Sequence, residues 1–394
     1  MCSPLGRRVR IRFEKIIFRA ASNDGPFSMK AYVIIFLVGL MACREATPVK
    51  PFVFPEEEKV SLLFCGDIMQ HFPQILSAYD SVRKEHNYMN SFKYMANYWL
   101  QTDFTIANLE TTLSDKGFSG YPRFCSPWQL VRDMHRCGIT TFVTANNHCC
   151  DQGEQGIKKT IHYLDSLHIE HTGTFSDTAS YQDRFPLYLE KGKFKIALLN
   201  YTYGTNGLPV PKGCVVSLID TSRIKRHIQK ARQDSASNII VFMHWGYEYH
   251  STPNATQKKL NEWLHRQGVD IVIGSHPHVV QPAEYAINGK DTVGITVYSL
   301  GNLISNQHYR YTDGGISVRL TLTRKADGLF SYRMKYLGHY LYRPYENGAR
   351  KYYIVPEPMA DSIVKGNYSI SSKKYFLHLD SLLKQIEKIK EQNR

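Results

Sequence analysis

The stretch VSLLFCGD, residues 60–67, sets the pattern of the chain. Its apolar run at 60–65 has the length of a strand buried on both faces, and it ends on a glycine followed by a carboxylate. The same arrangement recurs along the chain. The further candidate strands are 104–108, 141–145, 195–199, 238–243, 270–274 and 294–299.

Helical patterns separate these strands, at 90–101, 127–137, 154–168, 220–234 and 255–267. Within one of them, Ile157, Ile161 and Leu164 recur every three to four residues, which is typical of a helix with one buried stripe. Alternating strands and helices predict crossover connections and sheets covered by helices, so we expect an α/β fold.

The pattern changes after residue 300. Residues 315–322 and 330–341 alternate apolar and polar side chains, as antiparallel strands do. Residues 372–392 have the spacing of an amphipathic helix. We therefore expect a folded domain over 59–350, with an antiparallel segment near its end, and a helical tail over 351–394.

The N-terminal segment has the features of an export signal. Residues 31–42 are uncharged and apolar, too few to span a bilayer easily but typical of the apolar core of a signal peptide. Cys43 follows at once, as in the lipobox of bacterial lipoproteins, although a plain anchor helix is the alternative. We expect a signal region over 1–43, in which 1–28 precede a second start at Met29, then a Pro-rich tether over 44–58.

The composition indicates a globular chain with a basic surface. The 394 residues are 43% hydrophobic and carry a net charge of +14, of which residues 1–42 supply +5. A basic surface favours anionic polymers or phosphorylated ligands, while solubility alone is the other explanation. We expect no nucleic-acid partner. We assign no disulfide, and we expect Cys65 to act as a small buried hydrophobe.

Polar side chains follow the predicted strands. Open α/β sheets bind ligands at the carboxyl ends of their strands, where the chain turns into loops. Five strand ends each offer a carboxylate, an amide or an imidazole. These residues are Asp67, Asn108, Glu110, Asn146, Asn147, His148, Asp151, His244, Glu248, His276 and His278.

Mixed nitrogen and oxygen ligands suit zinc, iron or manganese, and carboxylate-rich sites suit manganese or magnesium. In His276-Pro277-His278, a two-residue offset along extended backbone would direct both rings to one side, onto one metal or two adjacent metals. His148 has a different expected role, because a carboxylate at Asp151 would orient it as a general acid. Alternatively, Asp151 caps the helix that begins near Gly153.

Several short motifs occur together over about residues 60–305. They are Gly66-Asp67-Ile68-Met69, Asn108-Leu109-Glu110, Asn146-Asn147-His148 with Asp151, His244-Trp245-Gly246-Tyr247-Glu248-Tyr249, Gly274-Ser275-His276-Pro277-His278 with Gln281, and Tyr298-Ser299-Leu300-Gly301-Asn302. In this order they resemble the CapA family of poly-γ-glutamate capsule biosynthesis proteins. The resemblance implies a metallophosphatase-like two-sheet sandwich flanked by helices.

The resemblance also implies roles for individual residues. Asp67 and His278 would bind one divalent metal ion, and Asn147, His244 and His276 a second. Glu110 would bridge the two, and His148 would be the general acid. The metallophosphatase pattern has a histidine where this chain has Met69, a poor ligand for hard ions. His71 is the nearest substitute, and the number of metals, one or two, stays open.

Two functions follow from these expectations. The first is a metal-dependent hydrolase of a phosphoester or an amide-linked polymer at the cell envelope. The second is a non-catalytic component that holds an anionic polymer beside capsule synthase components, tethered to the membrane through Cys43. Turnover that depends on His148 and His276 would distinguish the first from the second.

Overall fold

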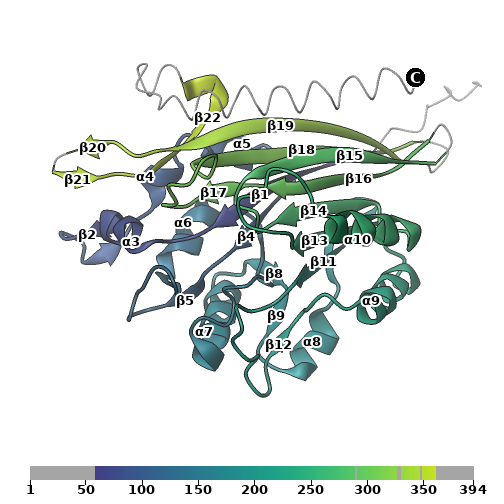
Figure 1. Ribbon diagram of the computed structural model, residues 1–394, viewed down its shortest axis with the longest axis horizontal. Coiled ribbons are helices and arrows are strands. Elements are labelled where there is room, and N and C mark those ends of the chain that lie inside the picture. Colours follow the sequence, from purple (N-terminus) through teal and green to yellow (C-terminus); the bar gives the residue numbers. More distant parts are fainter. Residues whose placement is uncertain (1–57, 289–290, 326–329, 347, 361–394) are drawn as a thin grey trace, which may run out of the picture. The chain divides into compact units, whose positions relative to one another are not determined.

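The computed structural model describes residues 58–288, 291–325, 330–346 and 348–360 (Figure 1). Two β-sheets form the centre of this part of the chain. The first has eight strands. In sheet order these are β22 (Tyr353–Pro356), β19 (Phe330–Tyr342), β18 (Gly314–Arg324), β1 (Glu58–Ile68), β4 (Phe104–Leu109), β7 (Thr141–Val143) and β8 (Glu170–Thr172), with β17 (Asn302–Ile304) paired to β1.

The second sheet has six strands. In order these are β10 (Leu187–Lys191), β11 (Phe194–Thr202), β13 (Asn238–His244), β14 (Ile271–Ser275), β16 (Asp291–Leu300) and β15 (Val280–Asn288). In the first sheet the parallel central strands adjoin antiparallel strands at one edge, and in the second sheet they adjoin one antiparallel strand at each edge, β10 and β15. The parallel set is β1, β4, β7 and β8 in the first sheet and β11, β13, β14 and β16 in the second.

The two sheets pack face to face because their strands are apolar on both sides. Along β1, Leu62 and Phe64 face the second sheet, and Phe64 lies 6.5 Å from Phe242 of β13 between ring centroids. The alternate residues Leu63 and Cys65 face outward into a second core. This alternation follows from the two-residue period of a strand, and it explains why a continuous apolar run marks each central strand.

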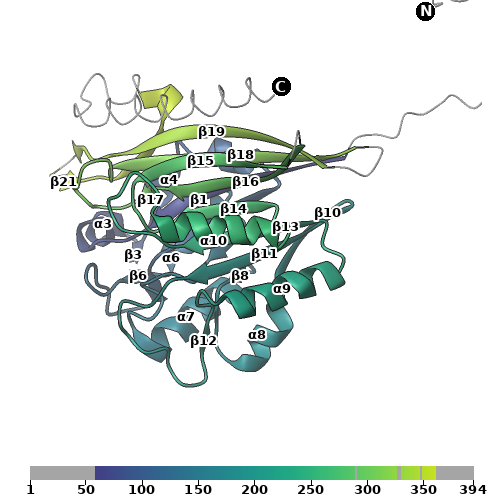
Figure 2. The ribbon, with the colours of Figure 1, turned by 45° about the vertical axis from the view of Figure 1, so that its right-hand side comes forward.

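Helices cover the outer face of each sheet. Over the first sheet lie α4 (Met89–Phe92), α5 (Ala96–Leu100), α6 (Gln129–Arg136) and α7 (Gly153–Ser166). Over the second lie α8 (Thr178–Arg184), α9 (Thr221–Gln233) and α10 (Ala255–Arg266), and Figure 2 shows α9 and α10 on the same side of that sheet. The expected fold class, a two-sheet α/β sandwich flanked by helices with an antiparallel segment near its end, is confirmed.

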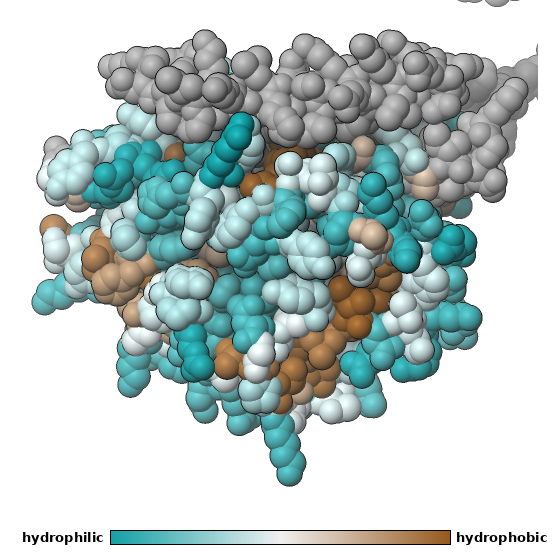
Figure 3. All heavy atoms as spheres, in the orientation of Figure 1, coloured by the Kyte–Doolittle hydropathy of each residue, from teal (hydrophilic) through white to brown (hydrophobic). Residues whose placement is uncertain are grey.

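Short elements complete the described chain. They are α3 (Phe72–Ala78), the 3₁₀ helix Glu357–Met359, and the strand pairs β2 (Tyr79–Asp80) with β3 (Glu85–His86), β5 (Thr112–Ser114) with β6 (Cys125–Pro127), β9 (Thr174–Phe175) with β12 (Val215–Val216), and β20 (Tyr345–Glu346) with β21 (Ala349–Arg350). The face seen in Figure 3 is mostly hydrophilic, and its hydrophobic residues form separate patches.

Three expected boundaries differ from the structure. The predicted helix 90–101 is two short helices separated at 93–95, because many of its residues are weak helix formers. Phe92 and Trp99 are buried on these two helices. Glu58, expected at the end of the tether, already belongs to β1. Beyond residue 350, the strand β22 pairs with β19 and extends the first sheet.

Some expectations lie outside the described residues. These are the signal region with Cys43, the tether before Glu58 and the helix at 372–392. Within the described ranges, none of the helices has both the length and the apolar character that crossing a bilayer requires. Cys65 is fully buried beside Ser317, as expected for a small hydrophobe.

Candidate metal centre

The carboxyl ends of strands from both sheets meet at one place. In the first sheet, Asp67 of β1 pairs in register with Asn108 of β4 on one side and with Asn302 of β17 on the other. In the second sheet, His244 of β13 is in register with Ser275 of β14. Because parallel strands end at a common edge, residues far apart in the sequence become neighbours here.

A glycine makes the close approach between strands possible. A Cβ atom on Gly66 would lie 1.9 Å from the carbonyl oxygen of Gly301, a distance at which atoms overlap. The absence of that atom lets the amide of Asp67 donate to the same carbonyl at 3.0 Å. The carboxylate of Asp67 is thereby fixed at the strand end.

Two overlapping groups of side chains could hold a metal ion. Within each group, one ligand atom from every residue lies within 4.8 Å of the others. All five residues involved are buried, and each follows a predicted strand. One group is Glu110, His276 and His278, and the other is Asp67, Glu110 and His244.

The amide of Asn147 joins this cluster. Its Oδ1 lies 2.7 Å from Nε2 of His244, and that nitrogen lies 3.6 Å from Oε1 of Glu110. On the other side, His278 places Nδ1 3.1 Å from Oδ2 of Asp67 and Nε2 3.8 Å from Glu110. The structure therefore brings together all six residues expected to bind metal, with Glu110 between the two histidine sides.

Buried polar atoms without partners show that these residues fit a cation. Oε1 of Glu110 and Nδ1 of His276 are buried and have no hydrogen-bond partner. A buried carboxylate beside a second one at Asp67 is costly unless a positive charge balances it. Burial, followed by the charge of Asp67, raises the pKa of Glu110 well above its ordinary value.

The histidines are in the form that binds metals. Burial lowers the pKa values of His244 and His276 well below the ordinary value, so both imidazoles are neutral at physiological pH. Nitrogen and carboxylate donors together suit manganese, iron or zinc. The orphaned atoms, the buried acid pair and the neutral imidazoles thus fit a divalent metal ion.

Polar neighbours hold the ligands in position. Asn108 donates from Nδ2 to Asp67 at 2.8 Å and contacts Glu110 and His244 at 3.3 Å each. Ser275 Oγ lies 3.0 Å from Nδ1 of His244, and Asn302 Oδ1 lies 3.1 Å from Nδ1 of His278. Such partners fix the orientation of ligating rings. Asn108 and Asn302 were expected in the site, whereas no role was predicted for Ser275.

The backbone at the His-Pro-His segment was predicted wrongly. His276 and His278 have φ values of 96° and 58°, in the left-handed region rather than in extended backbone. β14 ends at Ser275, so the strand geometry does not continue into the segment. The rings still converge, with centroids 5.9 Å apart. Unfavourable φ values in non-glycine residues persist where the surroundings fix them, and they cluster at functional sites.

His148 and Asp151 form a separate pair next to the cluster. Nδ1 of His148 lies 2.7 Å from Oδ2 of Asp151, which also accepts from the amide of Phe124 at 2.7 Å. A carboxylate only accepts, so Nδ1 of His148 donates and Nε2 is left for other contacts. The alternative role of Asp151 as a helix cap is wrong, because α7 begins at Gly153 after an N-cap residue, Gln152, whose side chain makes no capping hydrogen bond.

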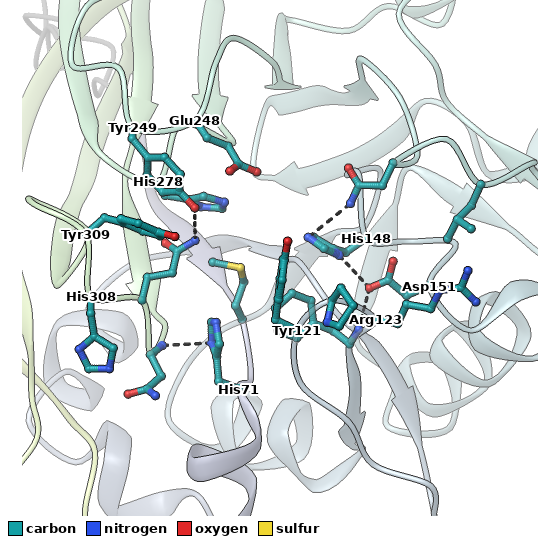
Figure 4. A pocket seen from close by; sticks show the side chains of 17 residues that line it. His71, Tyr121, Arg123, His148, Asp151, Glu248, Tyr249, His278, His308 and Tyr309 are labelled. Atoms are coloured by element: carbon teal, nitrogen blue, oxygen red, sulfur yellow. Dashed lines mark hydrogen bonds and ion pairs between the residues drawn. The ribbon is translucent and has the colours of Figure 1, made fainter.

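A cavity of about 820 Å³ opens beside the two clusters. In Figure 4, Glu248, Tyr249, His278 and Tyr309 lie on one side of it, and His148, Asp151 and Arg123 lie on the other. Met69 also lines the cavity and is almost fully buried. Glu248, expected in the site, is half-buried at this wall.

His71 does not replace the missing histidine ligand. It lines the cavity, yet neither metal group includes it. Its Nδ1 accepts from the amide of Asn306 at 3.2 Å, and burial lowers its pKa to about 4.

Two residues near the site were missed altogether. Asn206 bridges Asn147 and His148, and the ring of Tyr203 lies 4.6 Å from that of His276. Both sit in a loop without an apolar pattern to mark it.

The fold and this geometry define a class of protein: a two-sheet α/β sandwich with a candidate divalent-metal centre at the carboxyl ends of its strands. Residues 61–307 match the family described as bacterial capsule synthesis protein PGA_cap, and the chain belongs to that family. This confirms the family resemblance that the motifs indicated.

Two curated relatives carry the name CapA. The capsule biosynthesis protein CapA of Bacillus anthracis is 25% identical over 306 residues, which cover 74% of this chain and 70% of that protein. The PGA biosynthesis protein CapA of Bacillus subtilis is 25% identical over 305 residues, which cover 76% of each.

Solved structures with some likeness to this chain include two bacterial enzymes. The NAD nucleotidase of Haemophilus influenzae has a TM-score of 0.46 at 12% identity, covering 83% of this chain and 67% of that one. A calcineurin-like phosphoesterase from Bacillus subtilis has a TM-score of 0.45 at 15% identity, covering 84% of this chain and 98% of that one.

Proposed function

We propose that this chain is a metal-dependent hydrolase of capsule synthesis that cleaves a phosphoester or an amide-linked polymer. One observation carries the proposal. A carboxylate-oriented imidazole, His148 with Asp151, lines the same cavity as His278, which belongs to the candidate metal centre. An acid next to a metal-ligand cluster is the arrangement that hydrolysis requires.

The cluster residues would hold the metal. Asp67, Glu110 and His244 form one group, Glu110, His276 and His278 form the other, and the amide oxygen of Asn147 lies against His244. A bound divalent ion polarises a scissile phosphoryl or carbonyl group and lowers the pKa of bound water. Met69 stands where the metallophosphatase pattern has a histidine, so the centre has one strong ligand fewer.

His148 would protonate the leaving oxygen. Asp151 accepts the Nδ1 proton, so the ring is held with Nε2 as the atom that carries the transferred proton. Asn206 approaches that nitrogen at 3.5 Å, and the ring edge of Phe124 packs against the imidazole at 4.7 Å between centroids. These contacts fix the ring while leaving it at the cavity wall.

A second candidate function is binding without turnover. The net charge of +14 favours an anionic polymer as a ligand. In this case the metal would shape a polymer-binding groove beside capsule synthase components.

We further propose that the protein is anchored at the cell envelope through a lipid on Cys43. The apolar run at 31–42 and the cysteine directly after it support this location. Labelling of the native protein, but not of Cys43→Ala, with radioactive palmitate in growing cells tests it. An unlabelled native protein would remove the proposal.

The hydrolase is tested on the full chain purified in detergent. Metal content is measured first, and the protein is then incubated with bis(p-nitrophenyl) phosphate and with γ-linked glutamate in the presence of manganese or zinc. We expect turnover that is lost in His148→Ala while bound metal stays. Retention of the polymer without turnover in the native protein would support the binding role instead.

A further inference from the structure

Tyrosine rings line the cavity next to the candidate metal centre. Tyr121 and Tyr309 are 75% and 62% exposed, and Tyr249 is 40% exposed (Figure 4). Each comes from a different loop: the first precedes β6, Tyr249 follows β13 and Tyr309 follows β17. Large exposed aromatic rings at the mouth of a cavity mark a binding surface rather than a packing feature.

Two of these rings form one continuous surface. The ring centroids of Tyr249 and Tyr309 lie 4.5 Å apart with 40° between the planes, so no flat group fits between them. Gln307 donates from Nε2 to the hydroxyl of Tyr249 at 3.2 Å, which fixes that ring. The pair therefore offers an apolar face with hydroxyl groups at its edge, which suits a ligand with one apolar face and a polar rim.

The charges of the cavity wall do not favour a polyanion. Among the described residues that line it, Arg123 is the one side chain with a permanent positive charge, and Asp151 and Glu248 are carboxylates. Burial keeps His71 neutral, with a pKa of about 4. A polymer that carries a carboxylate on every unit would find no row of positively charged side chains in this cavity.

We propose that the cavity binds an uncharged sugar ring on the tyrosine surface and presents a phosphoester on that ring to the metal centre. This inference rests on the proposed hydrolase and names its substrate class: a sugar phosphate rather than γ-linked glutamate. Hydrolysis breaks the bond between phosphorus and the sugar oxygen. Water supplies the new oxygen on phosphorus, the proton on Nε2 of His148 goes to the sugar oxygen, and a proton from that water is released and restores the protonated His148 for the next turnover.

The volume agrees with this substrate. A cavity of about 820 Å³ is within the range that encloses small-molecule ligands, and it has room for more than one sugar ring. Tyr249 and Tyr309 stand on the side of His278, across the cavity from His148 (Figure 4). A phosphoester between the sugar and the metal centre would therefore lie within reach of the proposed acid.

The first test compares two phosphate esters with the same kind of leaving oxygen. The full protein loaded with manganese is given glucose 6-phosphate and ethyl phosphate. We expect kcat/KM to be about tenfold higher for the sugar ester, since tenfold corresponds to one good stacking contact. Tyr309→Ala should remove that preference by raising KM for glucose 6-phosphate. Tyr345→Ala, at a ring 72% exposed outside the cavity, is the matched control.

The second test needs no metal. Saturation-transfer NMR with maltose on the chelator-treated protein should show binding that Tyr249→Ala and Tyr309→Ala both weaken and Tyr345→Ala does not. Equal rates for the two esters, a tenfold preference for adenosine monophosphate, or binding of γ-linked glutamate in place of maltose would overturn the inference. If neither ester is hydrolysed while maltose still binds, the hydrolase proposal fails and the sugar site stands.

Discussion

The candidate metal centre and the tyrosine wall of the cavity differ in almost every structural respect. Asp67, Glu110 and His244 are fully buried at strand ends, and the side-chain amide of Asn108 contacts all three. Tyr121 and Tyr309 are exposed on loops. Rigid strand ends fix ligands precisely enough for chemistry, whereas loops can change without disturbing the core. The comparison implies that reaction type and substrate choice reside in separate parts of this site.

Removing the central carboxylate should have the largest effect. Glu110→Gln should abolish metal uptake and lower turnover by on the order of a thousandfold or more, because both candidate groups share Glu110. The same change should stabilise the metal-free protein by about 1–3 kcal/mol, because a carboxyl whose pKa is raised well above its ordinary value is costly to bury at neutral pH and an amide is not. Metal analysis and urea unfolding in chelator measure the two effects.

Glu248→Gln is the matched control for that variant. Glu248 is half-buried at the cavity wall and belongs to neither metal group, so metal content should stay at the native level. A Glu110→Gln protein that binds metal as tightly as the native protein would show that the strand ends are not the metal site.

Removing the proposed general acid should lower the turnover rate and leave the metal content unchanged. His148→Ala should lower kcat by about 10²–10⁴-fold, the usual contribution of a general acid, with metal content unchanged. Asp151→Asn should cost less, and the double variant should be no slower than His148→Ala because the two act as a unit. Loss of metal in His148→Ala would show that His148 belongs to the metal centre. It would contradict the assignment of the acid and the metal ligands to separate groups.

A histidine outside the candidate metal centre and the tyrosine wall should affect the stability of the fold but not the metal content. Between α9 and the second sheet, His227 contacts the hydroxyls of Tyr181 and Tyr201 at 2.8 Å each, and burial lowers its pKa from 6.5 to about 4. The unfolded chain gains a proton at this residue below about pH 6.5, and the folded chain does so only near pH 4. Stability is therefore full above pH 6.5 and is lost as the pH falls towards 4.

His227→Gln should lessen that loss. Between about pH 7.5 and about pH 4.5, the drop in the free energy of unfolding should be smaller by about 1–2 kcal/mol than in the native protein. Urea titrations at the two pH values measure it, and metal content at neutral pH serves as the control. An unchanged drop would mean that the pKa of His227 is the same in the folded and the unfolded chain.

The sequence predicted the central strands well because each is a short run buried on both faces, as in β1 and β13. It missed β8 and β22, which have three and four residues and too little pattern to stand out. A helix was predicted over 90–101, but its break at 93–95 was not. At 93–95 the low helix propensity of the residues opposes a continuous buried helix. The break is visible only in the hydrogen bonds of the structure.

The positions of the polar residues at strand ends followed from the sequence, because the carboxyl ends of parallel strands share an edge. The sequence did not show which atoms of these residues face each other. The left-handed backbone at His276 and His278 and the hydrogen bond of Asp151 to the amide of Phe124 depend on neighbours distant in the chain. Neither could be read from spacing.

By itself, the sequence determined the fold class, the family and the residue types that meet in the site, since burial periodicity and motif order are written along the chain. The tertiary structure alone decided that both sheets end at one cluster, that Glu110 stands between its two sides, and that tyrosines from three loops form the cavity wall. Convergence of segments up to about two hundred residues apart depends on how the two sheets pack, which no local pattern encodes.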